Sequence, residues 1–119
     1  MQKTSHELAV ELAVDITKLA DKIKCRAEQA YIKQIVRSAS SVSANISEAK
    51  YAESDADFVH KLEIAQKECY ETENWLMVLN RSGAINEQVF KALRNKCGKI
   101  RRMLIASITT VKKRTFLKG

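Results

Sequence analysis

The sequence predicts an all-α protein, an antiparallel up-down-up-down four-helix bundle, and three observations lead there. The chain of 119 residues has no proline and only three glycines, the residues on which the turns of sheet proteins depend. Its 45% hydrophobic content fits one packed core rather than disorder. Apolar residues recur at steps of three and four in four segments. We therefore expect a single domain over residues 1–119, with helices at about 4–24, 28–50, 55–81 and 87–116.

The first helix is expected to begin at a capping box. In Thr4-x-x-Glu7 each side chain satisfies a free backbone N–H of the other residue. The apolar face that follows is Leu8, Leu12, Ile16, Leu19 and Ile23. The junction with the second helix, at about 25–28, contains neither glycine nor proline, so one continuous helix is the alternative. Against it, the apolar pattern loses phase where Gln34 falls at a position that needs an apolar residue.

The stretch SVSANISEAKY, residues 41–51, has the serine-rich composition typical of a loop. The apolar seam nevertheless continues through it. The seam residues are Ile32, Ile35, Ala39, Val42, Ile46 and Ala49. Serine costs at most about half a kcal/mol in a helix, and packing of a seam overrides that cost. We therefore expect this segment to be mostly helical.

The third and fourth helices carry further boundary signals. Ser54-x-x-Asp57 is a second candidate capping box, Gly83 a candidate left-handed C-cap and Asn86 a candidate N-cap. The third seam is Phe58, Leu62, Ala65, Cys69, Thr72, Leu76 and Leu79. The fourth seam is Val89, Leu93, Cys97, Ile100, Leu104, Ile108 and Val111.

The net charge of +7 is concentrated in the last helix. Residues 1–87 carry eleven Lys or Arg and fourteen Asp or Glu, whereas residues 88–119 carry ten Lys or Arg and no acid. Cations along one helix face neutralise phosphates and release counterions, which gives binding that is sensitive to salt and independent of sequence. The candidate nucleic-acid-binding residues are Lys91, Arg94, Arg101, Arg102, Lys112 and Lys113. The alternatives are a solvated face, or pairing within or between subunits with the acids Asp57, Glu68 and Glu71.

A stripe of polar residues runs beside the apolar seam of the second helix. Small polar side chains allow close helix approach and hydrogen bonding, which predicts an oligomer interface; plain solvent exposure is the alternative. The stripe consists of Gln34, Ser38, Ser41, Asn45 and Glu48. Trp75, on the flank of its own seam, either anchors such an interface or fills the core.

No motif of catalytic, metal or phosphate-loop chemistry is present, so we expect no enzyme activity, no metal and no cofactor. His6 and His60 are isolated, and His60-x-x-Glu63 reverses the order found in di-iron bundles, so a metal-dependent enzyme is the weaker alternative. The thiols Cys25, Cys69 and Cys97 form no C-x-x-C pair, which favours reduced, mostly buried cysteines. Without a signal peptide or a membrane-spanning run, we expect a cytoplasmic protein that does not contact membranes.

The stretch IVRSASSVSANISEA, followed by DFVHKLEIAQKECYETENWL, resembles the bacterial four-helix-bundle proteins named for intervening sequences in 23S ribosomal RNA genes. The positions that carry the resemblance are Tyr31, Gln34, Arg37, Ser41, Asn45, Ile46, Glu48, Phe58, Leu62 and Ala65. The resemblance implies an antiparallel four-helix protomer and a ring-shaped homo-oligomer, often a pentamer. A related protein, the accessory protein of diversity-generating retroelements, is a basic pentamer that binds a reverse transcriptase and nucleic acid.

Taken together, charge and resemblance lead us to expect a non-enzymatic oligomeric accessory protein that binds RNA or DNA through its basic C-terminal helix. A ring would repeat a weak basic row several times and so raise affinity. The alternative function is a homo-oligomeric protein–protein adaptor or scaffold whose basic face binds an acidic protein partner.

Overall fold

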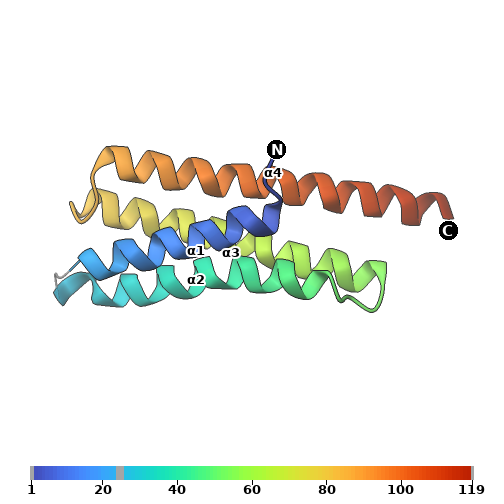
Figure 1. Cartoon of the computed structure of the whole chain (residues 1–119), viewed down its shortest axis with the longest axis horizontal. Helices are drawn as coiled ribbons and strands as arrows, with labels where there is room; N and C mark the ends of the chain where they lie inside the picture. Colours follow the sequence, from blue (N-terminus) through green and yellow to red (C-terminus); the bar gives the residue numbers. More distant parts are fainter. Residues whose placement is uncertain (1, 24–25, 119) are drawn as a thin grey trace.

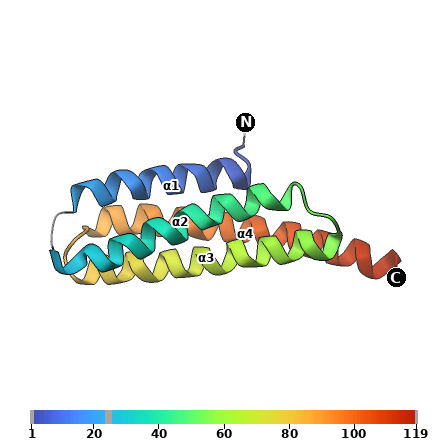
Figure 2. The same cartoon turned by 90° about the horizontal axis from the view of Figure 1, so that it is seen from below.

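The chain folds into four helices that lie side by side and reverse direction at each connection (Figures 1 and 2). The computed structural model describes the backbone of residues 2–23 and 26–118 and the side chains of residues 2–23 and 27–115. The helices are α1 (Ser5–Lys22), α2 (Gln29–Ala49), α3 (Asp55–Arg81) and α4 (Glu87–Lys118), with a short 3-10 helix, η1 (Arg26–Glu28), before α2. The predicted all-α up-down-up-down bundle is confirmed.

The bundle is a rod of 53 × 25 × 23 Å, and its helices differ in length. α1 has 18 residues and α4 has 32, or about 48 Å at 1.5 Å per residue. Figure 1 shows that α1 covers only the first part of α4, so the C-terminal part of α4 extends beyond it. Within the described residues, no helix combines the length and the apolarity that crossing a membrane requires.

α1 and α2 are separate helices. α1 ends at Lys22 because Ile23 adopts an extended backbone, with φ −90° and ψ 113°. The chain then turns through η1 and enters α2 at Gln29. The alternative of one continuous helix is therefore excluded. Two predictions, the end of the first helix at residue 24 and the burial of Cys25, lie outside the described residues.

The predicted caps start the helices, with one difference. Thr4 Oγ1 accepts the Glu7 N–H at 3.1 Å, and the Glu7 carboxylate accepts the Thr4 N–H at 3.3 Å, which completes the capping box of α1. Ser54 caps α3 through the Asp57 N–H at 3.0 Å. The Asp57 carboxylate, however, accepts the N–H of Glu53 rather than that of Ser54. The reciprocal half of that box is therefore displaced by one residue.

A glycine in the left-handed region makes the turn between α3 and α4. Gly83 has φ +86°, a conformation that side-chain-bearing residues rarely adopt. Two backbone N–H groups, those of Ala84 and Ile85, donate to the Leu79 carbonyl at 2.9 and 3.3 Å. Asn86 then caps α4, since its Oδ1 accepts the Val89 N–H at 2.8 Å. Both predictions for this turn are confirmed.

The four apolar seams meet in one continuous core. All six seam residues of α2 are buried, so the serine-rich stretch is helical up to Ala49. Burial of a Leu or Ile side chain contributes about 1.5–3 kcal/mol, which outweighs the helix cost of a serine. In α3 and α4 the buried seam begins one residue later than predicted. Val59 and Phe90 are buried, whereas the predicted first residues, Phe58 and Val89, are only half-buried. Adjacent residues at a helix end differ by about 100°, so either can face the core.

Candidate nucleic-acid interface

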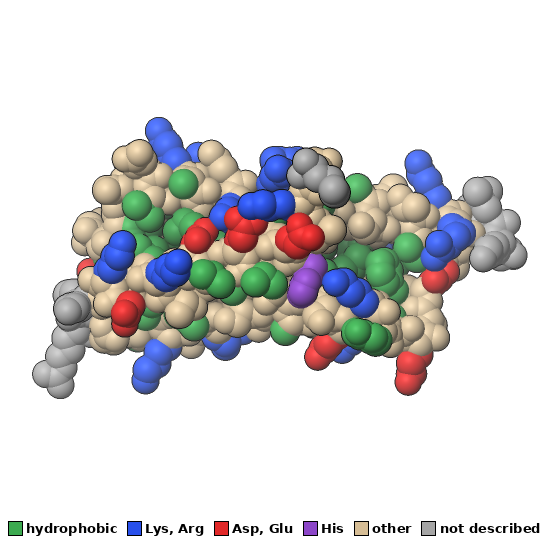
Figure 3. All heavy atoms as spheres, in the orientation of Figure 1, with side chains coloured by type: hydrophobic (Ala, Val, Ile, Leu, Met, Phe, Trp, Pro, Cys, Tyr) green, Lys and Arg blue, Asp and Glu red, His purple; other side chains and the backbone are tan. Residues whose placement is uncertain are grey.

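The side of α4 opposite its buried seam carries a band of exposed cations, which we call the α4 outer face. It consists of Lys91, Arg94, Lys99, Arg102 and Lys113. At 100° per residue these positions fall within about 140° of arc. Among the described residues, no acidic oxygen lies within 4.0 Å of any of them except Glu87, whose Oε1 is 4.0 Å from Lys91 Nζ. Figure 3 shows Lys and Arg side chains projecting from the upper edge, which α4 forms, while most acids gather below it.

Two of the predicted binding residues lie nearer to acids of α3. Arg101 Nε and Nη2 donate to the Glu73 carboxylate at 2.7 and 3.0 Å, and these hydrogen bonds raise the pKa of Arg101. The exposed fraction of the Arg101 side chain is 22%, so it is partly enclosed. Lys112 Nζ is 3.6 Å from Glu63, with both side chains at least half exposed, a geometry worth little in water. Arg101 is therefore locally neutralised, whereas Lys112 stays available.

Other cations of α4 tie the helix to its neighbours. Lys96 Nζ lies 2.7 Å from Asp15 and 3.7 Å from Glu11, which links α4 to α1. Arg114 lies 3.1 Å from Asp55 at the start of α3. These residues were not among the predicted binding residues. Their pairing accounts for part of the positive charge of the last helix without any external partner.

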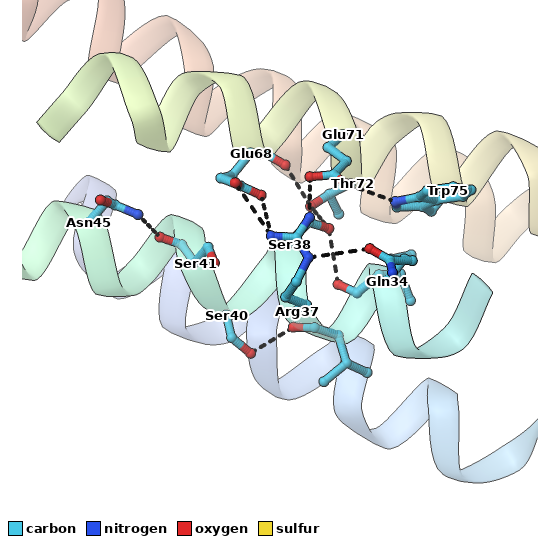
Figure 4. Close-up of polar contacts among 12 residues, drawn as sticks. Gln34, Arg37, Ser38, Ser40, Ser41, Asn45, Glu68, Glu71, Thr72 and Trp75 are labelled. Carbon is cyan, nitrogen blue, oxygen red and sulfur yellow. Dashed lines mark hydrogen bonds and ion pairs between the residues drawn. The ribbon is translucent and has the colours of Figure 1, made fainter. Parts of the chain in front are cut away.

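The acids considered as internal partners of α4 lie elsewhere. Glu68 and Glu71 of α3 face Arg37 of α2 (Figure 4): Arg37 Nη1 is 3.3 Å from Glu68, and Nη2 contacts Glu71. Asp57 is engaged with the N–H of Glu53. The prediction that these three acids could neutralise the basic helix within the chain is therefore wrong. They serve the α2–α3 interface and the start of α3.

The Arg37 cluster has a defined electrostatic pattern. The hydrogen bond from Arg37 lowers the pKa of Glu71, and the same bond raises the pKa of Arg37. Burial raises the pKa of Glu68, and a hydrogen bond with Glu71 raises it further. The Trp75 indole N–H donates to Glu71 at 3.4 Å (Figure 4). One arginine thus holds two carboxylates that would otherwise repel each other.

The polar stripe of α2 divides into an inner and an outer part. Ser38 is fully buried, and its hydroxyl lies 2.8 Å from Thr72 Oγ1 and donates to the Ile35 carbonyl at 3.2 Å. Ser38 therefore joins α2 to α3 within one chain and is not available to a second copy. Small side chains at this crossing let the two helices approach closely.

The remaining members of the stripe are accessible to different degrees. Gln34 is exposed and accepts from Arg37 Nε at 3.3 Å, and Glu48 is 3.2 Å from Lys61. Asn45 is half-buried and donates to the Ser41 carbonyl at 2.8 Å, so its amide is partly satisfied within its own helix. Trp75 is half-buried, packs against the core and lies 5.7 Å from Tyr31, centroid to centroid.

Three functional candidates on α4 were missed from the sequence: Lys99, Asn95 and Gly98. Lys99 belongs to the α4 outer face, and the one-sided charge of the helix was the signal for it. Asn95 and Gly98 line a hollow between α3 and α4. A glycine inside a helix costs about 1 kcal/mol relative to alanine, and that local cost was the signal that sequence reasoning passed over.

The cysteines that the structure describes are core residues. Cys69 and Cys97 are buried and free, and burial raises the pKa of Cys69 to about 12 and that of Cys97 further. Such thiols stay protonated and are poor nucleophiles near neutral pH. Within the described part of the chain, no group of three or more His, Cys, Asp or Glu side chains is placed to hold a metal ion.

Comparison with known proteins identifies relatives over most of the chain. A family model described as 23S rRNA-intervening sequence protein matches residues 3–106. A solved structure from Bacteroides thetaiotaomicron, described as a protein of unknown function from the S23 ribosomal protein family, superposes with a TM-score of 0.81 at 39% identity. The alignment covers 88% of this chain and 98% of that one. No curated protein matches this sequence at a significant level.

Proposed function

This chain belongs to the 23S rRNA-intervening sequence protein family, and we propose that it is a non-enzymatic accessory protein that binds RNA or DNA through the α4 outer face. The observation that carries the proposal is the exposure of five cations in one band, four of them with no acidic oxygen within 4.0 Å among the described residues. Elsewhere in the bundle, Arg37 and Lys96 are held between acids. Cations that lack internal partners are the ones that gain by meeting phosphates.

Binding of this kind holds the nucleic acid in place and does not involve a chemical reaction. Each cation that meets a phosphate releases condensed counterions, so affinity falls as salt rises. The face consists of lysine and arginine side chains, which favours contact with the sugar-phosphate backbone over base stacking. A ring-shaped homo-oligomer, as the family resemblance implies, would present several copies of the face to one polynucleotide.

The test is salt-dependent binding of a labelled single-stranded RNA of mixed sequence. We expect a linear fall of log Kobs with log[salt], with a slope of about −3, or roughly 0.7 for each of four or five contacts. A variant with Arg94→Gln, Lys99→Gln, Arg102→Gln and Lys113→Gln should lose most of this slope. The matched control carries Lys18→Gln, Lys33→Gln, Lys67→Gln and Arg81→Gln, four exposed cations of α1, α2 and α3.

Both variants remove four positive charges from a chain of net charge +7, so only the location of the charge differs. Equal losses in the two variants would show that the overall charge, and not the α4 outer face, drives binding. No binding by the unmodified protein at low salt would overturn the proposal.

An apolar groove favours a second candidate function, a homo-oligomeric adaptor. Val10 and Val14 of α1 are 41% and 44% exposed, and they line a groove of about 320 Å³ that reaches Ser43 of α2. Exposed apolar grooves are typical of protein contact sites. Light scattering should then give a mass that is a multiple of the 13.5 kDa chain mass. Val10→Lys with Val14→Lys should reduce that mass. Tyr51→Lys, at a site that is 84% exposed, should leave it unchanged. An adaptor of this kind would show no affinity for RNA.

A further inference from the structure

A basic hollow lies between α3 and α4, at the middle of the proposed nucleic-acid interface. It has a volume of about 220 Å³, room for several waters at about 30 Å³ each. Its lining is Glu73, Arg94, Asn95, Gly98, Arg101 and Arg102. Three guanidinium groups and one carboxylate leave a net charge of +2 around this small space. The hollow therefore attracts anions, and its donors suit an anion that carries several acceptor oxygens.

Gly98 is the floor of the hollow, and packing does not account for it. A Cβ at this position would meet Arg102 Nη1 at 3.4 Å and Arg101 Nη2 at 3.8 Å, both of them ends of flexible side chains. Its φ is not in the left-handed region, so an alanine would fit the backbone. Glycine weakens a helix interior, yet here no neighbour excludes a methyl group. What the glycine does provide is room for the guanidinium groups of Arg101 and Arg102 to lie close to the helix backbone.

Two of the three arginines are restrained by contacts within the chain before any ligand arrives. Arg101 is fixed by Glu73 and lies over the Tyr70 ring, 4.4 Å from its centroid. Arg94 lies over the Phe90 ring at 5.1 Å. Cation–π contact and ion pairing restrict these long side chains, so less entropy is lost when they bind. Arg94 and Arg102 keep donors free, since no acid lies within 4.0 Å of either among the described residues.

We propose that this hollow seats one backbone phosphate of the bound RNA or DNA and so sets the register of the strand on α4; the inference rests on the proposed function. Guanidinium groups present forked N–H donors that match phosphate oxygens. Asn95 adds an amide donor at the rim. A carboxylate and a phosphodiester each bring one negative charge, so charge alone does not separate them. The tetrahedral phosphodiester, however, presents its oxygens in more directions to the donors of Arg94 and Arg102, which no acid within 4.0 Å engages among the described residues. The exposed lysines of the α4 outer face then contact neighbouring phosphates.

The first test fills the hollow without changing charge. Gly98→Leu places an apolar side chain on its floor, and Ala92→Leu adds the same group at an exposed site of α4 as the matched control. With labelled single-stranded RNA of mixed sequence we expect Gly98→Leu to weaken binding at least fivefold and to reduce the salt slope by about 0.7, one phosphate. Ala92→Leu should bind as the unmodified protein does. Circular dichroism confirms that both variants are folded.

The second test keeps the positive charge but removes the paired N–H donors of the guanidinium groups. It does not depend on whether Gly98→Leu folds. Arg94→Lys with Arg102→Lys should weaken RNA binding at least threefold, because an ammonium group is a point charge without paired donors. Lys33→Arg with Lys67→Arg, at exposed sites of α2 and α3 outside the α4 outer face, is the matched control and should not weaken it.

The outcomes separate the two proposals. If the unmodified protein binds RNA and both hollow variants bind equally well, the hollow is not a phosphate seat, while the α4 outer face remains the binding surface. If the unmodified protein does not bind RNA, both proposals fail. Retention on phosphatidylglycerol vesicles that Gly98→Leu abolishes, without RNA binding, would assign the hollow to lipid headgroups and overturn the inference. A change of oligomeric mass in Gly98→Leu with unchanged RNA binding would assign it to carboxylates of a second copy.

Discussion

The α2–α3 interface and the α4 outer face both carry arginines, but they use them in opposite ways. At the interface, Arg37 lies between Glu68 and Glu71 of the facing helix. On the outer face, Arg94 and Arg102 have no acid within 4.0 Å among the described residues. The difference lies in what surrounds each cation and not in the cation itself. An excess of positive charge is available for binding only where the fold places no acidic side chain close enough to neutralise it.

The largest expected effect concerns the interface. Ser38→Leu should destabilise the fold by about 1–3 kcal/mol, because the fully buried Ser38 hydroxyl faces Thr72 and an added side chain overpacks the crossing. Urea denaturation measures the change in the free energy of unfolding. Ser40→Leu, two residues away and exposed, is the control and should change stability by less than about 0.5 kcal/mol. Equal effects of the two variants would contradict the close packing of α2 against α3 at Ser38.

A second prediction converts the outer face into a copy of the interface. Asn95→Glu places an acid four residues after Lys91 and four before Lys99. Each new pair should stabilise the helix by about 0.2–0.5 kcal/mol, while RNA affinity falls about fivefold, or about 1 kcal/mol. Fluorescence anisotropy and thermal melting report the two quantities. Asn95→Gln controls for the size of the side chain, and its binding should stay close to that of the unmodified protein.

The converse change should add binding at the interface. Glu68→Gln with Glu71→Gln removes both acids around Arg37, whose side chain is 46% exposed. One further cation is then available to a phosphate, so RNA affinity at low salt should rise about two- to threefold and the salt slope should steepen by about 0.7. Asp21→Asn with Glu53→Gln lowers the negative charge equally at other exposed sites. A rise of the same size in that control would trace the effect to net charge alone.

The smallest effect is a pH dependence of stability. The folded state lowers the pKa of Glu71, chiefly through the hydrogen bond from Arg37, so this carboxylate stabilises the fold above its unfolded pKa. That contribution is lost as pH falls through the folded pKa. Glu71→Gln should therefore cost about 0.2–1 kcal/mol at neutral pH, the range for exposed pairs, and progressively less toward about pH 3. Urea denaturation across this range is the measurement, and a difference that grows on acidification would contradict the assignment.

The fold was predictable because its signals are local. The three-four spacing through Val42 and Ile46 is stronger than the serine content around it, and capping residues such as Thr4 and Asn86 act within one turn. Helix ends were harder to predict, since α1 ends at the extended residue Ile23 without the glycine or proline that usually signals a helix end.

The site was predictable only in part, because pairing across helices depends on how each helix is rotated. Arg101 was correctly placed on the basic helix, but its partner Glu73 lies on the flank of α3 and was not foreseen. Glu68 was foreseen as a partner of α4 and instead faces Arg37. The hollow at Gly98 depends on side chains from two helices, so no single-helix pattern could reveal it.

The short α1 has a consequence for how the molecule opens. Beyond the start of α1, the end of α4 packs on the start of α3 through an apolar groove at Val59 and Val111 and through Asp55, which binds Arg114 and Thr115; its other neighbour there is the connection between α2 and α3. A segment with fewer neighbours opens at lower free energy than one enclosed on three sides. We therefore expect thermal opening of α4 to begin around residues 111–115 and to move toward the turns that α1 covers, so that the two ends of the rod differ in stiffness.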